Sequence, residues 1–184
     1  MAHDTLEHFL MYPLYRSGGH PNQPNWDKFV YDIEELHYGL LSMFFKQSAG
    51  FATEILKLPA KAKAESVMPP YSNHPFDLEV SVSSALYYVE VKTWADLDSS
   101  QVRRQTDHLR KHGAKGVYLL TSFQKWTAEQ IAKETGSLAH LVLFAQVADS
   151  LQSNLKDLKS PTKEIAQSYI SALRDLVRRT QGTA

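Results

Sequence analysis

Residues 76–92 read FDLEVSVSSALYYVEVK, two runs of alternating apolar and polar side chains on either side of Ser83-Ser84. Strict alternation is typical of β-strands that bury one face. We therefore expect a β-hairpin that turns at the two serines. Its apolar face would carry Leu78, Val80, Val82, Tyr87, Val89 and Val91. In this register Asp77 lies directly opposite Glu90, and directly opposed side chains lie roughly 5 Å apart.

The polar face of the hairpin would bring together acids from both strands. Asp77 and Glu79 come from the first strand, and Glu90 and Lys92 from the second. Two carboxylates at that distance repel each other unless a cation lies between them, and one lysine neutralises only one of them. The pattern therefore predicts a metal site. Asp77 would be its first ligand, and Glu79, on the same face, is the main alternative for that role. The alternative is the solvated face of an antiparallel sheet.

Composition limits the classes of function. The chain has 184 residues, which suits one domain. Its 20 basic and 20 acidic residues balance, so nucleic-acid binding would have to come from local patches. The absence of cysteine excludes disulfides, thiolate catalysis and Cys-based zinc sites. No segment reads as a signal peptide or a membrane span, so we expect a soluble, cytoplasmic protein without a membrane partner.

Helical and strand patterns extend outward from the hairpin in both directions. The helical period predicts helices over 26–47, about 100–112 and 128–135, and a last helix that begins near Pro161. Ser99 or Ser100 would cap the second helix, and Thr127 with Gln130 would form a capping box on the third. Short apolar runs predict strands at 66–68, 116–121 and 141–145, whereas 51–58 fits either a helix or a strand.

The resulting order, α–β–β–β–α–β–α–β–α, predicts an α/β fold with one mixed central sheet flanked by helices. Residues 1–25 contain a cluster of Pro, Gly and Asn, which predicts an N-terminal lead-in before a single domain over 26–184.

The motif His74-Pro75-Phe76-Asp77, followed after the turn by Val89-Glu90-Val91-Lys92, resembles the PD-(D/E)xK phosphodiesterase superfamily, which has the restriction-endonuclease-like fold. Residues 34–41, EELHYGLL, are similar to the Glu-x-x-His stretch of some bacterial nucleases of this type. Residues 101–109 are similar to their glutamine-bearing helix after the lysine, and residues 141–151 to their last core strand and the turn after it. The resemblance runs from about residue 26 onward, and it departs from the family where Phe76 separates the proline from the aspartate.

The resemblance implies a metal-dependent nuclease, endonuclease or exonuclease, that hydrolyses phosphodiester bonds. DNA is the expected substrate in a restriction, defence or repair setting, and RNA is the other possibility. Hard oxygen ligands suit Mg²⁺ or Mn²⁺, and they would come from Asp77, Glu90 and the Val91 carbonyl. Lys92 would orient the attacking water or stabilise the charge that develops on phosphorus.

Flanking residues extend this expected site. Glu34 lies at the edge of the apolar stripe of the first helix, so it is the candidate auxiliary ligand, while Glu35 lies on the far side. Gln101 would hold a water or a phosphate. The alternative for both Glu34 and Gln101 is a polar helix surface. Contacts to nucleic acid are predicted for Arg103, Arg104, His37 and Gln105. A solvated helix face and a structural histidine are the alternatives there.

Two other functions stay open. The chain could be a catalytically silent nucleic-acid-binding or assembly module on the same fold, or a structural α/β domain whose hairpin charges form a salt-bridge cluster. The complete set Asp77, Glu90 and Lys92 favours the enzyme. A duplex is cut most simply by two sites, which predicts a homodimer. The lack of a separate recognition domain predicts weak intrinsic sequence preference or a targeting partner protein.

Overall fold

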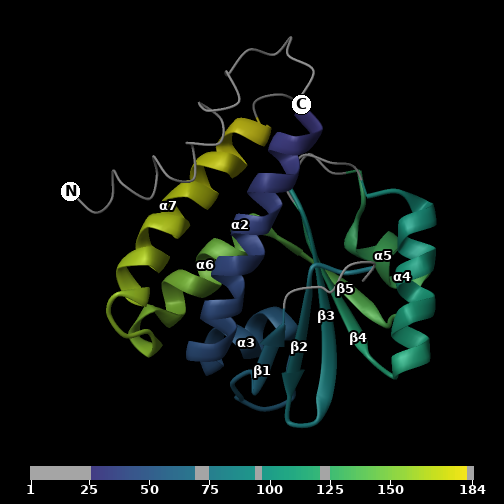
Figure 1. Cartoon of the computed structure of the whole chain (residues 1–184), viewed down its shortest axis with the longest axis horizontal. Helices are drawn as coiled ribbons and strands as arrows, with labels where there is room; N and C mark the ends of the chain where they lie inside the picture. Colours follow the sequence, from purple (N-terminus) through teal and green to yellow (C-terminus); the bar gives the residue numbers. More distant parts are fainter. Residues whose placement is uncertain (1–25, 69–74, 94–96, 121–124, 182–184) are drawn as a thin grey trace.

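A five-stranded mixed β-sheet forms the centre of the molecule, with strand order β1-β2-β3-β4-β5 (Figure 1). The computed structural model describes residues 26–68, 75–93, 97–120 and 125–181, and the side chains of 37–68, 75–93, 97–120 and 125–178. The predicted lead-in, 1–25, lies outside the described residues. The strands are β1 (Ser66–Met68), β2 (Leu78–Val82), β3 (Ala85–Lys92), β4 (Lys115–Leu120) and β5 (Ala139–Leu143). The first three are antiparallel and the last three parallel, so the α/β class and the mixed sheet are confirmed.

Helices cover both faces of this sheet (Figure 1). One face packs against α2 (Trp26–Gln47), α3 (Ala49–Leu56), α6 (Phe144–Asn154) and α7 (Thr162–Gln181). The other face packs against α4 (Ser99–His112) and α5 (Ala128–Thr135). The connections β3–α4–β4 and β4–α5–β5 advance across the sheet in the same direction. Since parallel crossovers are right-handed, α4 and α5 must lie on the same face.

The hairpin has the register that its alternation predicts. Its ladder runs from Leu78 paired with Val89 to Val82 paired with Ala85, and it turns at Ser83 and Ser84. All six predicted apolar residues lie in the larger core, below the helices of the first face; they are Leu78, Val80, Val82, Tyr87, Val89 and Val91. Both serines have positive φ, 48° and 66°, as the tight two-residue hairpin turns that match strand twist require.

A second, smaller core lies under α4 and α5. Phe76 and Tyr88 stack there with ring centroids 5.3 Å apart, and Val102 and Leu109 of α4 cover them together with Tyr118 of β4. Central strand β3 therefore contributes to a buried core on each of its faces. A polar side chain on this strand needs hydrogen-bond partners inside the protein.

The helix starts test the predicted caps. Thr127 and Gln130 form the predicted capping box at α5, with Gln130 N–H donating to Thr127 Oγ1 at 3.2 Å and Thr127 N–H to Gln130 Oε1 at 2.8 Å. At α4 the predicted cap, Ser99 or Ser100, is wrong. Asp98 has the extended backbone of a cap, and its Oδ1 accepts the Gln101 N–H at 2.8 Å. Its carboxylate also offers the negative charge that a helix N-terminus favours.

Two helices were not predicted as such. Residues 51–58 lie largely in α3, which begins after Ser48, whose Oγ accepts the Phe51 N–H at 3.0 Å. The strand expected over 141–145 ends at Leu143, and α6 replaces the expected turn. The buried residues of α6 include Phe144, Val147, Ala148 and Leu151, spaced as on one face of a helix. Within the described residues, no helix has both the length and the apolar character needed to cross a membrane.

The positive φ of Ser84 leads to a prediction about the stability of the hairpin. Glycine adopts positive φ without the steric cost that a Cβ brings, so Ser84→Gly should raise the free energy of unfolding by about 0.5–1 kcal/mol. Exposed Ser153 in α6 is the matched control, because Ser153→Gly places glycine within a helix and should lower that free energy by about 0.5 kcal/mol. Urea denaturation measures both. A loss of stability in Ser84→Gly would contradict the strained turn.

Candidate active site

The candidate site lies where β3 ends, beside the start of β2. Lys92 Nζ lies 3.0 Å from Glu90 Oε1, and this ion pair is largely withdrawn from water, with Glu90 only 2 % exposed. Asp77 directly precedes β2, and its N–H donates to the Val89 carbonyl at 3.0 Å. The structure thus places Asp77, Glu90 and Lys92 within one small region.

Glu90 is contacted by protein groups at both of its carboxylate oxygens. Its Oε1 accepts from Gln101 Nε2 at 2.6 Å as well as facing Lys92, and its Oε2 accepts from Gln105 Nε2 at 2.7 Å. A carboxylate so far from water is unfavourable unless donors replace its hydration, and three donors do so here. The two glutamines are one turn apart on α4, so both amides reach the sheet from the same helix face.

Asp77 contacts the main chain between the other two residues. Its Oδ2 accepts the Val91 N–H at 2.7 Å, so the aspartate is held next to the peptide that joins Glu90 to Lys92. If the ladder is continued by one residue, Asp77 stands opposite Glu90, as the sequence predicts. Glu79, the rival acid, pairs with Tyr88 across the hairpin. Burial and the neighbouring Glu79 raise the pKa of Tyr88 to about 12, so its hydroxyl stays protonated.

Tyr118 is a residue of this region that the sequence did not indicate. It pairs with Glu90 across β3 and β4 and is fully buried. Its hydroxyl has no hydrogen-bond partner among the described residues. Burial, and then the charge of Glu90, raises the pKa of Tyr118. The sequence of residues 116–121 indicates only a buried strand. Which of these residues lies beside Glu90 depends on the parallel register between β3 and β4.

Three predicted residues differ in how they relate to this cluster. Gln105, predicted as a nucleic-acid contact, is 0 % exposed and bonded to Glu90, so it has no surface to offer a substrate. Arg103 and Arg104 are exposed on α4, and Arg104 donates to Ser100 Oγ at 3.2 Å. At about 100° per residue, Arg104 points roughly 60° from Gln101, whereas Arg103 points roughly 160° away. Only Arg104 is therefore near the side of the helix that faces the cluster.

The first helix contributes less to the described site. The side chain of Glu34 lies outside the described residues. His37, one turn later, is buried against α6 and α7, with its ring stacked on Phe144 and its Nδ1 2.6 Å from the Tyr169 hydroxyl. This packing is that of a core histidine and not of a phosphate contact. Burial lowers the pKa of His37 to about 4, so the ring is neutral at physiological pH.

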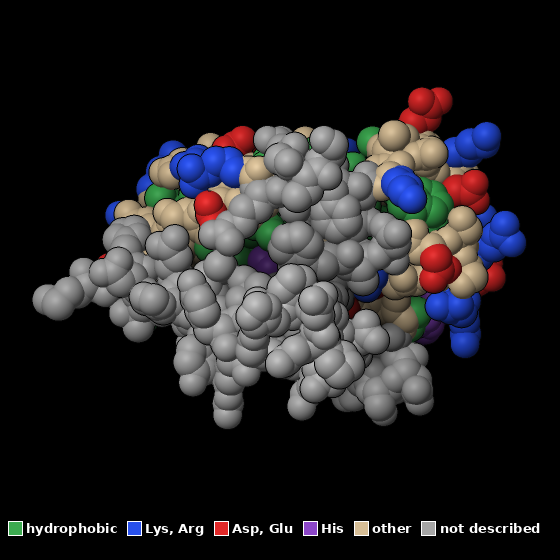
Figure 2. Space-filling model, turned by 90° about the horizontal axis from the view of Figure 1, so that it is seen from above, with side chains coloured by type: hydrophobic (Ala, Val, Ile, Leu, Met, Phe, Trp, Pro, Cys, Tyr) green, Lys and Arg blue, Asp and Glu red, His purple; other side chains and the backbone are tan. Residues whose placement is uncertain are grey.

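The donors available for a cation are oxygens. Among the described side chains, no group of three His, Cys, Asp or Glu residues lies close enough to hold a metal ion. Within this part of the chain a cation would depend on two carboxylates together with carbonyl oxygens. Acidic and basic side chains are interspersed on the described part of the face seen in Figure 2, with no extended basic area there.

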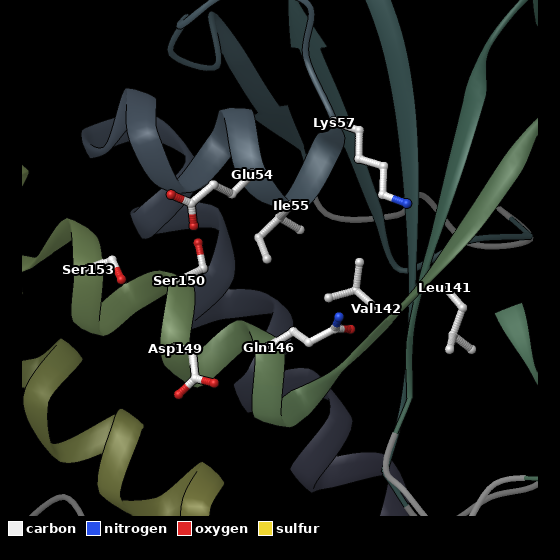
Figure 3. Close-up of a pocket in the computed structure, with 9 residues that line it drawn as sticks. All are labelled: Glu54, Ile55, Lys57, Leu141, Val142, Gln146, Asp149, Ser150 and Ser153. Carbon is white, nitrogen blue, oxygen red and sulfur yellow. The ribbon is translucent and has the colours of Figure 1, made fainter.

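A hollow of about 300 Å³ lies elsewhere, between α3, β5 and α6 (Figure 3). Its lining residues are Glu54, Ile55, Lys57, Leu141, Val142, Gln146, Asp149, Ser150 and Ser153. None of them is among the predicted site residues. One lining residue, Asp149, also lies 3.5 Å from Arg174 of α7 through its carboxylate.

The chain was compared with models of protein families, with curated proteins and with solved structures, and nothing matched.

His37 yields a prediction about pH. Its pKa is lower in the folded protein than in the unfolded chain, so the unfolded chain binds more protons between about pH 4 and 6.5. The contribution of His37 to the free energy of unfolding is therefore fully present above this window and is lost as the pH falls through it. When the pH is lowered from 7.5 to 5, protonation of this residue in the unfolded chain should lower the free energy of unfolding by about 2 kcal/mol.

His37→Gln keeps a hydrogen-bond acceptor for Tyr169 but does not titrate. Urea denaturation at pH 7.5 and pH 5 measures how much the free energy of unfolding falls between the two pH values. This fall should be about 2 kcal/mol smaller in the variant than in the wild type. Equal losses in the two proteins would mean that His37 is not held neutral in the core.

Proposed function

We propose that this chain is a metal-dependent phosphodiesterase of the PD-(D/E)xK type that cleaves DNA. The observation that carries the proposal is the contact set at the end of β3: Lys92 Nζ is 3.0 Å from Glu90 Oε1, and Asp77 binds the Val91 N–H between them. An acid ahead of a hairpin and a Glu-x-Lys on its second strand thereby come together. The restriction-endonuclease-like fold belongs to the same proposal, and a mixed five-stranded sheet with helices on both faces is compatible with it.

The residues present fit a hard divalent cation. Asp77, Glu90 and the Val91 carbonyl would hold Mg²⁺ or Mn²⁺, which prefer oxygen ligands. Lys92 balances one of the two carboxylates, so the three side chains together retain a negative charge that a cation would neutralise. When bound, the ion would supply Lewis-acid stabilisation of the phosphate and a water of lowered pKa.

The chain's own groups would do the rest of the work. The Lys92 ammonium carries three donor hydrogens, so it can contact a water or a phosphate oxygen while it stays beside Glu90. There it would hold the attacking water or stabilise the charge that develops on the phosphate. Gln101 holds Glu90 from α4, and the exposed Arg104 on the same helix would bind a backbone phosphate of DNA.

A module without turnover is the second candidate, and the burial of Glu90 favours it. Both carboxylate oxygens already accept hydrogen bonds from protein groups, and the residue is 2 % exposed. A cation that reaches Glu90 would therefore have to share these oxygens with the protein donors or displace one of them. If none does, the cluster serves to attach α4 to the sheet, and the chain acts by binding or assembly.

Asp77→Asn separates the two candidates. Asparagine keeps an oxygen that can accept the Val91 N–H, so the fold should be retained while the charge needed for a cation is lost. We expect cleavage of plasmid, single-stranded DNA or RNA in Mg²⁺ or Mn²⁺ to fall by roughly 100-fold or more. The measurement is the initial rate on gels, with EDTA as the blank and the thermal unfolding midpoint as the check on folding.

Glu79→Gln is the matched control, because it makes the same acid-to-amide change two residues further along the chain, in β2. It should leave the cleavage rate close to that of the wild type. An equal loss in Glu79→Gln would make Glu79 the metal-binding acid. Absence of metal-dependent cleavage of all three substrates by the wild type would favour the module without turnover.

A further inference from the structure

Gln105 is a buried polar side chain to which the proposed mechanism assigns no role. It is 0 % exposed, and its Nε2 lies 2.7 Å from Glu90 Oε2 and 2.6 Å from the Pro75 carbonyl oxygen. Pro75 is two residues before Asp77 along the chain. One amide nitrogen on α4 thus joins the side chain of one candidate ligand to the main chain that leads into the other.

The orientation of this amide follows from its partners. A carboxylate and a main-chain carbonyl can only accept, so the nitrogen of Gln105 must face them, and its two hydrogens match the two acceptors. Its Oε1 is then directed elsewhere, where it is buried without a partner among the described residues. A buried carbonyl oxygen without a hydrogen-bond partner costs free energy, and an apolar side chain at this position would avoid that cost. The contacts of the nitrogen are the compensating feature.

The two contacts connect parts of the site that are far apart in sequence. Asp77 is held to β3 by its own N–H and by its carboxylate on the Val91 N–H. Glu90 is also held by Lys92 and Gln101. Gln105 bonds both to the Pro75 carbonyl and to Glu90, so it helps to set the spacing between the segment that carries Asp77 and the carboxylate of Glu90.

We infer that Gln105 is a positioning residue, which clamps the Pro75–Asp77 segment to Glu90 so that both carboxylates are presented to one divalent cation. The role depends on the proposed metal-dependent function of the same site. It assigns Gln105 to the interior of the site, where the sequence alone had suggested contact with nucleic acid.

Gln105→Met is the main test, since methionine has a similar length and suits a buried position but has no donor. The binding of Mn²⁺ to the purified protein, without nucleic acid, is measured by titration calorimetry. Partners that orient metal ligands typically change metal affinity 10- to 100-fold when removed, so a loss of roughly this size is expected. In cleavage assays kcat should fall while KM stays nearly unchanged, because Gln105 has no exposed surface for substrate.

Gln105→Asn is the second variant. It keeps the amide but is one methylene shorter, so it cannot reach both acceptors together, and it should weaken Mn²⁺ binding in the same direction. Thr106→Val is the matched control on α4. Thr106 is also buried, but its hydroxyl donates to the Val102 carbonyl within the helix, so this variant should bind Mn²⁺ as the wild type does.

The outcomes distinguish the two proposals. If the wild type binds Mn²⁺ and cleaves while both Gln105 variants bind it equally well, the positioning role is wrong and the proposed function stands. A loss in Thr106→Val as large as in Gln105→Met would also overturn the role, since it would reflect general loosening of α4. If the wild type neither binds Mn²⁺ nor cleaves, both proposals fail together.

Discussion

The burial of the Glu90 carboxylate is the constraint on which the centre of this structure depends. A charge removed from water must be compensated inside the protein, and here Lys92, Gln101 and Gln105 compensate it. These groups come from β3 and from α4, and Gln105 extends the network to the segment before β2. Glu90 therefore fixes how the helix that follows the hairpin lies against the sheet.

The position of this charge is unusual for a central strand. Strand β3 has a core on each face, and the residues on either side of Glu90 along the strand, Val89 and Val91, are buried apolar residues. Well-packed apolar side chains often stabilise such a position as well as an ion pair does, or better. Glu90 is thus hard to explain by stability alone. Departures from local packing rules are expected at functional sites, where they are maintained for chemistry.

The same network explains why the sequence-based site is only partly reproduced. The hairpin residues come together because alternation and the turn set their register, and both are local. Gln101 and Gln105 were expected to contact a water, a phosphate or nucleic acid, but both bond to Glu90, because its carboxylate is buried where the helix packs on the sheet. His37 fills a gap between α2, α6 and α7, since the stripe that it shares with Leu41 and Phe44 is a core stripe.

By itself the sequence determined the hairpin and its register, the apolar faces of its strands, the extents of α2 and α5, and the order of the five strands with α2, α4, α5 and α7 among them. Each of these follows from periodicity or capping within a short window. The apolar residues of α6 also have helical spacing in the sequence. The apolar run 141–145, which overlaps the start of this helix, was predicted as a strand instead. Only the tertiary structure decided that Gln105 lies inside the site, that Tyr118 faces Glu90, and that His37 belongs to the core. The reason is physical: these contacts join residues that are distant in sequence, and which of them form depends on how helices and strands pack, a property that no local pattern contains.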